Sequence, residues 1–96
     1  MTESRRFIIL SHRKDSGSLQ IHGTAERYNT QLSWEAIRHQ PTSEWCIRIP
    51  RQPGTRSDIQ QAYQLIVGGF TDFRQDLMQK LQRFDWTQPP ALPFPL

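Results

Sequence analysis

The chain is poor in cysteine, and its one cysteine, Cys46, excludes both an internal disulfide and a cysteine cluster for zinc. The histidines do not compensate, because no two of His12, His22 and His39 have the close spacing of a ligand pair on one helix. If residues 12 and 22 lie on paired strands, their side chains also point to opposite faces. We therefore expect no metal and no other cofactor.

Long apolar runs are also lacking. Arg5 and Arg6 are followed by only four apolar residues, Phe7 to Leu10, which is too short for the apolar region of an export signal. No stretch approaches the about 20 apolar residues that a membrane span needs. We expect a cytoplasmic protein without a membrane partner.

Catalytic signatures are equally scarce. Cys46 stands between Trp45 and Ile47 in a strand-like run, where a cysteine is more often an inert small apolar residue than a nucleophile. The segments "PGTRSD" and "VGGFTD" lack the glycine and lysine pattern of a nucleotide-binding loop. The carboxylates are scattered along the chain. We therefore expect a protein that is not an enzyme.

The residues needed for one packed domain are present. Of 96 residues, 35% are hydrophobic and 10% are aromatic, and this aromatic content is too high for a disordered chain. Charged residues make up 22%, and the mean hydropathy is −0.70. The formal net charge of +3 permits an anionic partner without requiring one.

Two strands joined as a hairpin are expected at the start. Residues 5–14 form a short apolar run, and residues 18–28 alternate apolar and polar side chains. A loop of two or four residues around Ser16 and Gly17 would place Ile8 and Leu10 on the same face as Leu19 and Ile21. Phe7 and Ile9 would then lie on the opposite face.

Two further strands follow. Residues 29–41 alternate at Leu32, Trp34 and Ala36, although Ser33 could instead begin a short helical turn. Residues 44–50 alternate more clearly and end at Pro50, which cannot donate to a strand ladder. The segment 51–56 reads as an exposed linker.

From Ser57 the apolar period becomes helical and continues to Phe84. Gly68 and Gly69 interrupt it, and Thr71 could cap a second helix, but the unchanged apolar phase favours one long helix that bends at the glycines. Such a helix would be about 40 Å long against strands of about 20 Å. Its far end would be exposed unless the chain bends back at the glycines or a second protomer covers it, and symmetric pairing as the commoner remedy favours a homodimer. The side chains concerned are Phe73, Leu77, Met78, Leu81 and Phe84.

The expected fold is α+β: a four-stranded antiparallel meander and one C-terminal helix in two layers, forming a domain over residues 1–86. Residues 87–96, "TQPPALPFPL", form an extended proline-rich tail. Trp86, Leu92 and Phe94 are large apolar groups that favour docking of the tail, either on its own sheet or on a partner.

Two functions fit these features. The first is a small interaction or regulatory protein that binds a protein partner through Phe7 and Ile9 on an open sheet face, through the helix end, and through the tail. The second is a single-stranded nucleic-acid binder whose open face provides stacking and phosphate contacts. Its candidate residues are Arg5, Arg6, Arg13, His22, Arg48, Arg51 and Arg56. The order of strands and helix resembles the Pur-repeat and Whirly single-strand binders in topology alone.

Overall fold

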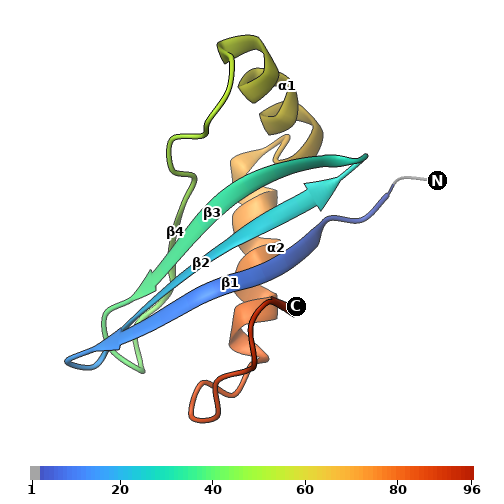
Figure 1. Ribbon diagram of the computed structural model, residues 1–96. Coiled ribbons are helices and arrows are strands. Elements are labelled where there is room, and N and C mark those ends of the chain that lie inside the picture. Colours follow the sequence, from blue (N-terminus) through green and yellow to red (C-terminus); the bar gives the residue numbers. More distant parts are fainter. Residues whose placement is uncertain (1–2) are drawn as a thin grey trace.

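A sheet of five antiparallel strands, with two helices, makes up the computed structural model, which describes residues 3–96 (Figure 1). Residues 1 and 2 of the expected domain lie outside this range. The expectation of a small α+β domain is confirmed, but its counts were wrong, because a fifth strand and a second helix are present. The strands are β1 (Arg6–Asp15), β2 (Ser18–Arg27), β3 (Thr30–Arg38), β4 (Cys46–Arg48) and β5 (Phe94–Pro95), in spatial order β4-β3-β2-β1-β5. The helices are α1 (Arg56–Ile66) and α2 (Phe70–Gln82).

Two tight turns set the register of the three long strands. Ser16 and Gly17 join β1 to β2 with φ of 49° and 89°, and Tyr28 and Asn29 join β2 to β3 with φ of 51° and 57°. Positive φ at both central residues is the conformation that matches the right-handed twist of a two-residue hairpin. The expected two-residue loop at Ser16 and Gly17 is therefore confirmed.

A bulge in β1 overturns the expected faces of its first half. From Asp15 to Ser11 the strand pairs with β2 in the register that the turn imposes, but beyond Leu10 the register shifts and Ile9 pairs with Gly23. Leu10 is the extra residue. Side chains alternate between the two faces of a sheet. The extra residue therefore moves every β1 side chain before Leu10 to the face opposite the expected one.

The placement of Phe7 and Ile9 on an open face was therefore wrong. Both side chains are fully buried in the core, whereas Leu10, which was expected to be inside, is 50% exposed. Ile8 is only partly buried. The other expected core residues of the sheet are buried, namely Leu19, Ile21, Trp34, Trp45 and Ile47.

Trp34 lies across Gly23 on the covered face of the sheet. The two residues are partners in the β2–β3 ladder, and a Cβ on Gly23 would overlap the Trp34 ring and the Ile8 carbonyl oxygen. The ring of Phe7 packs edge-on against Trp34 and against Phe73 of α2. The missing side chain at residue 23 thus makes room for the centre of the core.

The long helix expected over residues 58–84 was wrong, because the glycines separate two helices. Gly68 has a φ of 62°, and its N–H and that of Val67 both donate to the Tyr63 carbonyl, the arrangement that ends a helix at a glycine. Gly69 is the N-cap of α2. The N-cap of α1 is Thr55, whose hydroxyl accepts from the Asp58 N–H at 3.2 Å, so the helix begins just before Ser57, where the helical period was expected to start.

The break turns α2 back across the covered face of the sheet, as Figure 1 shows. Phe73, Leu77 and Leu81 are fully buried there. With 13 residues, α2 is only about 20 Å long. The expectation of an exposed helix end was therefore wrong. The homodimer was expected because of that exposed end, so this reason for it no longer holds.

The proline-rich tail docks on its own sheet. Phe94 pairs with Ile9 and Pro95 with Ile8, and the Leu96 N–H donates to the Phe7 carbonyl at 2.8 Å. The Phe94 ring contacts Phe84 edge-on at 5.4 Å between ring centres. The tail thus lies along the outer edge of β1, next to the half of the strand that contains the buried Phe7 and Ile9 (Figure 1).

Candidate functional site

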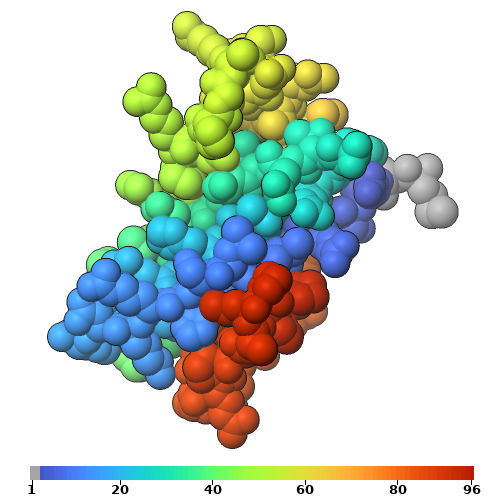
Figure 2. All heavy atoms as spheres, in the orientation of Figure 1, coloured from blue at the N-terminus to red at the C-terminus, as the bar shows by residue number. Residues whose placement is uncertain are grey.

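Within residues 3–96, no layer covers the sheet face opposite the helices, and Figure 2 shows this side of the molecule with the tail lying along β1. Cross-strand pairing identifies its side chains, since directly paired residues share a face. Among the residues of the described strands, those on this face include no phenylalanine, tyrosine or tryptophan. They are Arg6, Ile8, Ser11, Arg13, Asp15, Ser18, Gln20, His22, Thr24, Glu26, Gln31, Ser33, Glu35, Ile37, Cys46, Arg48 and Pro95.

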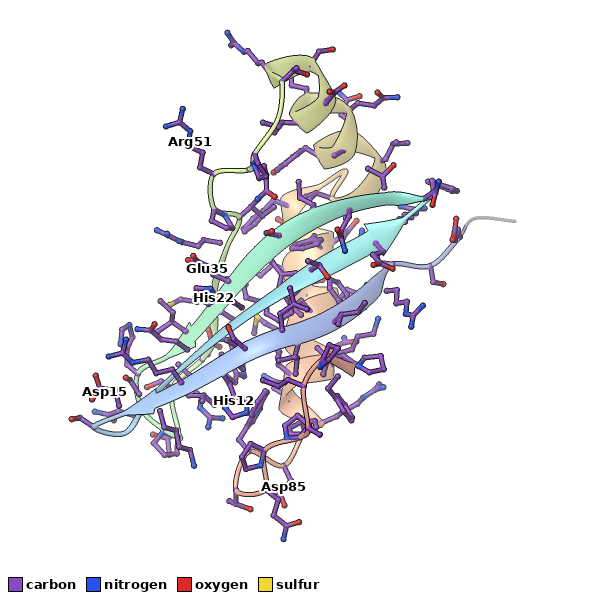
Figure 3. All side chains as sticks on the ribbon, viewed as in Figure 1. His12, Asp15, His22, Glu35, Arg51 and Asp85 are labelled. Carbon is purple, nitrogen blue, oxygen red and sulfur yellow. The ribbon has the colours of Figure 1, made fainter. Side chains whose placement is uncertain are left out.

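The charges on this uncovered face balance. Its three arginines stand against three carboxylates, and two arginines are already paired: Arg48 Nε donates to Glu35 Oε2, and Arg13 lies 3.6 Å from Asp15. A third pairing brings His22 Nε2 to 4.0 Å from Glu35 Oε1, and Figure 3 shows His22 and Glu35 close together. The face therefore offers no net positive surface to an anion.

Ser11, His22 and Glu35 form a cross-strand row, and these residue types occur in hydrolytic triads. The geometry differs from a triad, because within residues 3–96 no hydrogen bond joins Ser11 to His22, and Glu35 is held by Arg48. His22 is 55% exposed on a flat surface. Glu35 pairs with Arg48 and lies beside His22, whereas Ser11 has no such partner in the described part of the chain, so the row provides no activated nucleophile.

Two large apolar side chains are exposed where the tail meets β1. Leu10, the bulge residue of β1, is 50% exposed, and Leu92, which precedes β5, is 39% exposed. Leu10 follows Ile9, which pairs with Phe94, and Leu92 lies two residues before Phe94, so both flank the β1–β5 pairing that also joins Ile8 to Pro95. We call Ile8, Leu10, Leu92 and Pro95 the tail-edge patch. Sequence reasoning missed Leu10, and only the register shift reveals it.

Most residues expected to contact a protein partner form the core instead. The structure brings these residues together where the sheet, α2 and the tail pack against one another. Binding was expected from their exposure, and of these residues only Leu92 is exposed. Buried are Phe7, Ile9, Phe73, Leu77, Leu81 and Trp86; Phe84 and Phe94 are partly buried against them.

The seven residues expected to contact nucleic acid do not share one surface. Arg6, Arg13, His22 and Arg48 lie on the uncovered face, whereas Arg56 begins α1 and Arg51 lies in the preceding loop and points away from the sheet (Figure 3).

Arg5 belongs to the interior of the structure. Its Nε donates to the Ile66 carbonyl at 2.7 Å, its Nη1 lies 3.2 Å from Asp76, and its guanidinium lies over the Phe73 ring. It joins the start of β1 to the helices. Phe7, the expected stacking platform, is on the covered face.

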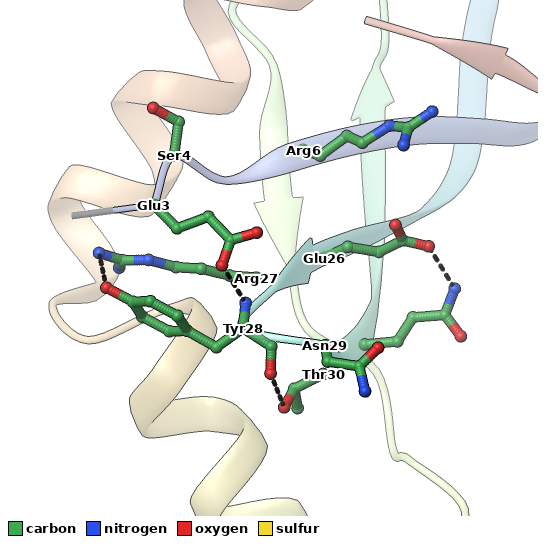
Figure 4. A pocket seen from close by; sticks show the side chains of 9 residues that line it. Glu3, Ser4, Arg6, Glu26, Arg27, Tyr28, Asn29 and Thr30 are labelled. Atoms are coloured by element: carbon green, nitrogen blue, oxygen red, sulfur yellow. Dashed lines mark hydrogen bonds between the residues drawn. The ribbon is translucent and has the colours of Figure 1, made fainter. Parts of the chain in front are cut away.

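A cavity of about 730 Å³ lies at the β2–β3 turn (Figure 4). Tyr28 donates its backbone N–H to Glu3 Oε2 at 3.1 Å, and the Arg27 guanidinium lies over the Tyr28 ring. Arg6 and Glu26 also line it. Two arginines and two glutamates leave the cavity without net charge, so its electrostatics select no class of ligand.

No group of three or more histidine, cysteine, aspartate or glutamate side chains within residues 3–96 is arranged to hold a metal ion. In the same range, neither helix is long and apolar enough to cross a membrane. The Thr87 side chain and backbone N–H both bond to Asp85 and lower the pKa of that carboxyl below its ordinary value.

Comparison with known proteins finds no matching family model, no similar curated protein and no similar solved structure.

Proposed function

We propose that the chain is a small, non-catalytic, cytoplasmic interaction protein that binds a protein partner through the uncovered sheet face, at its tail-edge patch. The observation that carries the proposal is the exposure of Leu10 and Leu92 at the same edge. Exposed leucines beside the partly buried Ile8 and the exposed Pro95, rimmed by polar residues, are typical of protein contact surfaces. The balanced charges of the rest of the face suit a polar rim.

The same observations make nucleic acid the weaker candidate. A single-strand binder needs aromatic platforms and a positively charged track. Two of the three arginines on the uncovered face are paired, with Asp15 and Glu35, and the apolar groups of this face are aliphatic. We therefore treat nucleic-acid binding as an outcome of the test.

The proposal is tested by placing a photo-crosslinking amino acid at residue 10 of the full chain in its native cells. We expect a discrete protein adduct that disappears when Leu92 is changed to serine. The matched control carries the crosslinker at the exposed Arg51, away from the patch, and should give no such adduct. Identical adducts from both positions, or none from residue 10, would contradict the proposal.

The mass of the crosslinked adduct also tests whether the chain forms the expected homodimer. An adduct of twice the chain mass means that a second copy occupies the patch, and sedimentation equilibrium of the Leu10→Ser variant should then show loss of the dimer. Binding of labelled single-stranded DNA or RNA that weakens steeply between about 50 and about 200 mM salt would overturn the proposal in favour of nucleic acid.

A further inference from the structure

A different cavity lies on the covered face, at the end of the sheet beyond α2. Its volume is about 440 Å³, within the usual range for small-molecule sites. Lys14, Leu19 and Arg38 form one cross-strand row along it, because Leu19 pairs with Lys14 on one side and with Arg38 on the other. Two strand spacings separate the outer residues, so their backbones are about 10 Å apart. Two cations thus flank an apolar side chain.

Part of the wall of this cavity is apolar and firmly held. Leu19 is 3% exposed and Trp86 is 6% exposed. The Trp86 indole N–H donates to the Leu81 carbonyl at 3.1 Å, and its ring contacts Phe84 with 4.6 Å between ring centres. The segment after α2 therefore holds a rigid aromatic wall opposite the Lys14–Leu19–Arg38 row.

The two cations have no anionic partner among residues 3–96. No carboxylate lies within ion-pair distance of Arg38 or Lys14, although Arg38 is half-buried and its Nε is buried without a hydrogen-bond partner. The Arg38 guanidinium lies over the Trp45 ring at 4.9 Å, which orients it without neutralising it. A buried donor without an acceptor destabilises a protein, so its retention calls for an explanation.

Asp85 is the carboxylate that lines the cavity, but it is occupied elsewhere. Its Oδ1 accepts from the Thr87 hydroxyl at 2.6 Å and from the Thr87 N–H at 3.0 Å. No ion pair joins it to Arg38 or Lys14 within residues 3–96, and the two cations with this one carboxylate leave the cavity a net charge of +1.

We propose that this cavity binds a small organic anion with a flat apolar body, an aromatic carboxylate being the chemical class that fits. Its carboxylate would lie between Arg38 and Lys14, and its ring would lie against Leu19 and Trp86. Arginine suits this role, because its planar donors match the two oxygens of a carboxylate. The site is on the face opposite the tail-edge patch, so it does not depend on the proposed function.

The test uses 2-naphthoate and its neutral analogue 2-naphthamide, titrated into the isotope-labelled protein while the Trp86 indole N–H is followed by NMR. We expect naphthoate to shift this resonance saturably and to bind at least tenfold more tightly than naphthamide, since the ligands differ in charge. Equal affinity for the two, or no saturable shift at millimolar naphthoate, would overturn the proposal.

Variants assign the contact. Arg38→Gln and Lys14→Gln should each weaken naphthoate binding several-fold and leave naphthamide unchanged, whereas Arg51→Gln, which removes the same charge from an exposed loop, should change neither. Unchanged naphthoate affinity in Lys14→Gln would contradict the proposal even if Arg38→Gln fails to fold. Leu10→Ser should bind naphthoate normally, which separates this test from that of the protein-binding patch.

Discussion

The two faces of the sheet are made from the same strands and stabilised in different ways. On the covered face, Phe7, Ile9 and Trp34 are buried under α2, and Gly23 gives up its side chain so that the Trp34 ring can approach. On the uncovered face, Glu35 and its neighbours are satisfied by cross-strand ion pairs. Apolar packing stabilises the covered face, whereas the exposed charge pairs of the uncovered face contribute little to the stability of the fold.

The difference shows that register, rather than apolarity, decides burial in β1. Ile8 and Ile9 are chemically identical neighbours, and only the position of the bulge makes one a core residue and the other a partly exposed one. Substitutions at matched positions on the two faces can therefore measure how much each face contributes.

The largest difference between the faces is expected at Gly23. Gly23→Ala places a Cβ against the Ile8 carbonyl and the Trp34 ring, neither of which can move away without distorting the sheet. We expect the free energy of unfolding to fall by about 3 kcal/mol or more, measured by urea denaturation.

Gly69→Ala is the matched control, because no atom lies within 4 Å of the added carbon and its φ of −89° suits alanine. We expect a loss of at most about 1 kcal/mol, since alanine is a poorer N-cap than glycine. If both variants are equally stable, Trp34 does not pack across Gly23.

The isoleucine pair comes next. Ile9→Ala removes a fully buried side chain and should reduce the free energy of unfolding by about 2–5 kcal/mol. Ile8→Ala removes the same atoms from the partly exposed face and should have a clearly smaller effect, in the same denaturation measurement. The reverse order would mean that β1 pairs without the bulge.

The arginine pair gives a smaller contrast. Arg5→Gln removes a half-buried charge that bonds to the Ile66 carbonyl and Asp76, and should decrease the free energy of unfolding by about 1–2 kcal/mol. Arg6→Gln, on the uncovered face, should change it by less than about 0.5 kcal/mol. Thermal unfolding of the two variants side by side measures the difference, and equal losses would contradict the interior position of Arg5.

The smallest effect is expected outside both faces, at Asp85. The pKa of its carboxyl is lowered because Thr87 donates to the ionised form. A lowered folded-state pKa means that the contribution to stability is present above the ordinary carboxyl pKa and is lost as the pH falls through the lowered value. Thr87→Val removes the hydroxyl donor and should raise the pKa of Asp85, measured by carbon NMR of the carboxyl; an unchanged pKa would contradict this hydrogen bond.

The sequence was sufficient for the elements whose signals are local. Alternation around Ile21, Trp34 and Ile47 identified three strands and their buried side chains, and Ser16 and Gly17 identified the hairpin. The bulge has no such signal, because it depends on how the whole of β1 packs against α2. One residue outside the alternation was enough to exchange the expected faces.

The candidate site could be predicted only in part. The order of the strands and helices predicted that one face of the sheet is uncovered. The sequence also identified Leu92 as an apolar residue of the tail. The helix break was ambiguous, because Gly68 and Gly69 leave the apolar phase unchanged while the positive φ of Gly68 ends α1. The row of Lys14, Leu19 and Arg38 joins three strands, and it becomes visible only once their register is known.

The bulge leaves β1 with one residue more than its ladder uses. If Leu10 were deleted, Ile9 would still face Gly23 and Ser11 would still face His22, so each pair on either side would survive. A deletion two or three residues away, in contrast, would turn part of the strand inside out. The bulge leucine of the candidate contact surface is therefore also a residue that the fold can spare, so this surface could change without any rebuilding of the core.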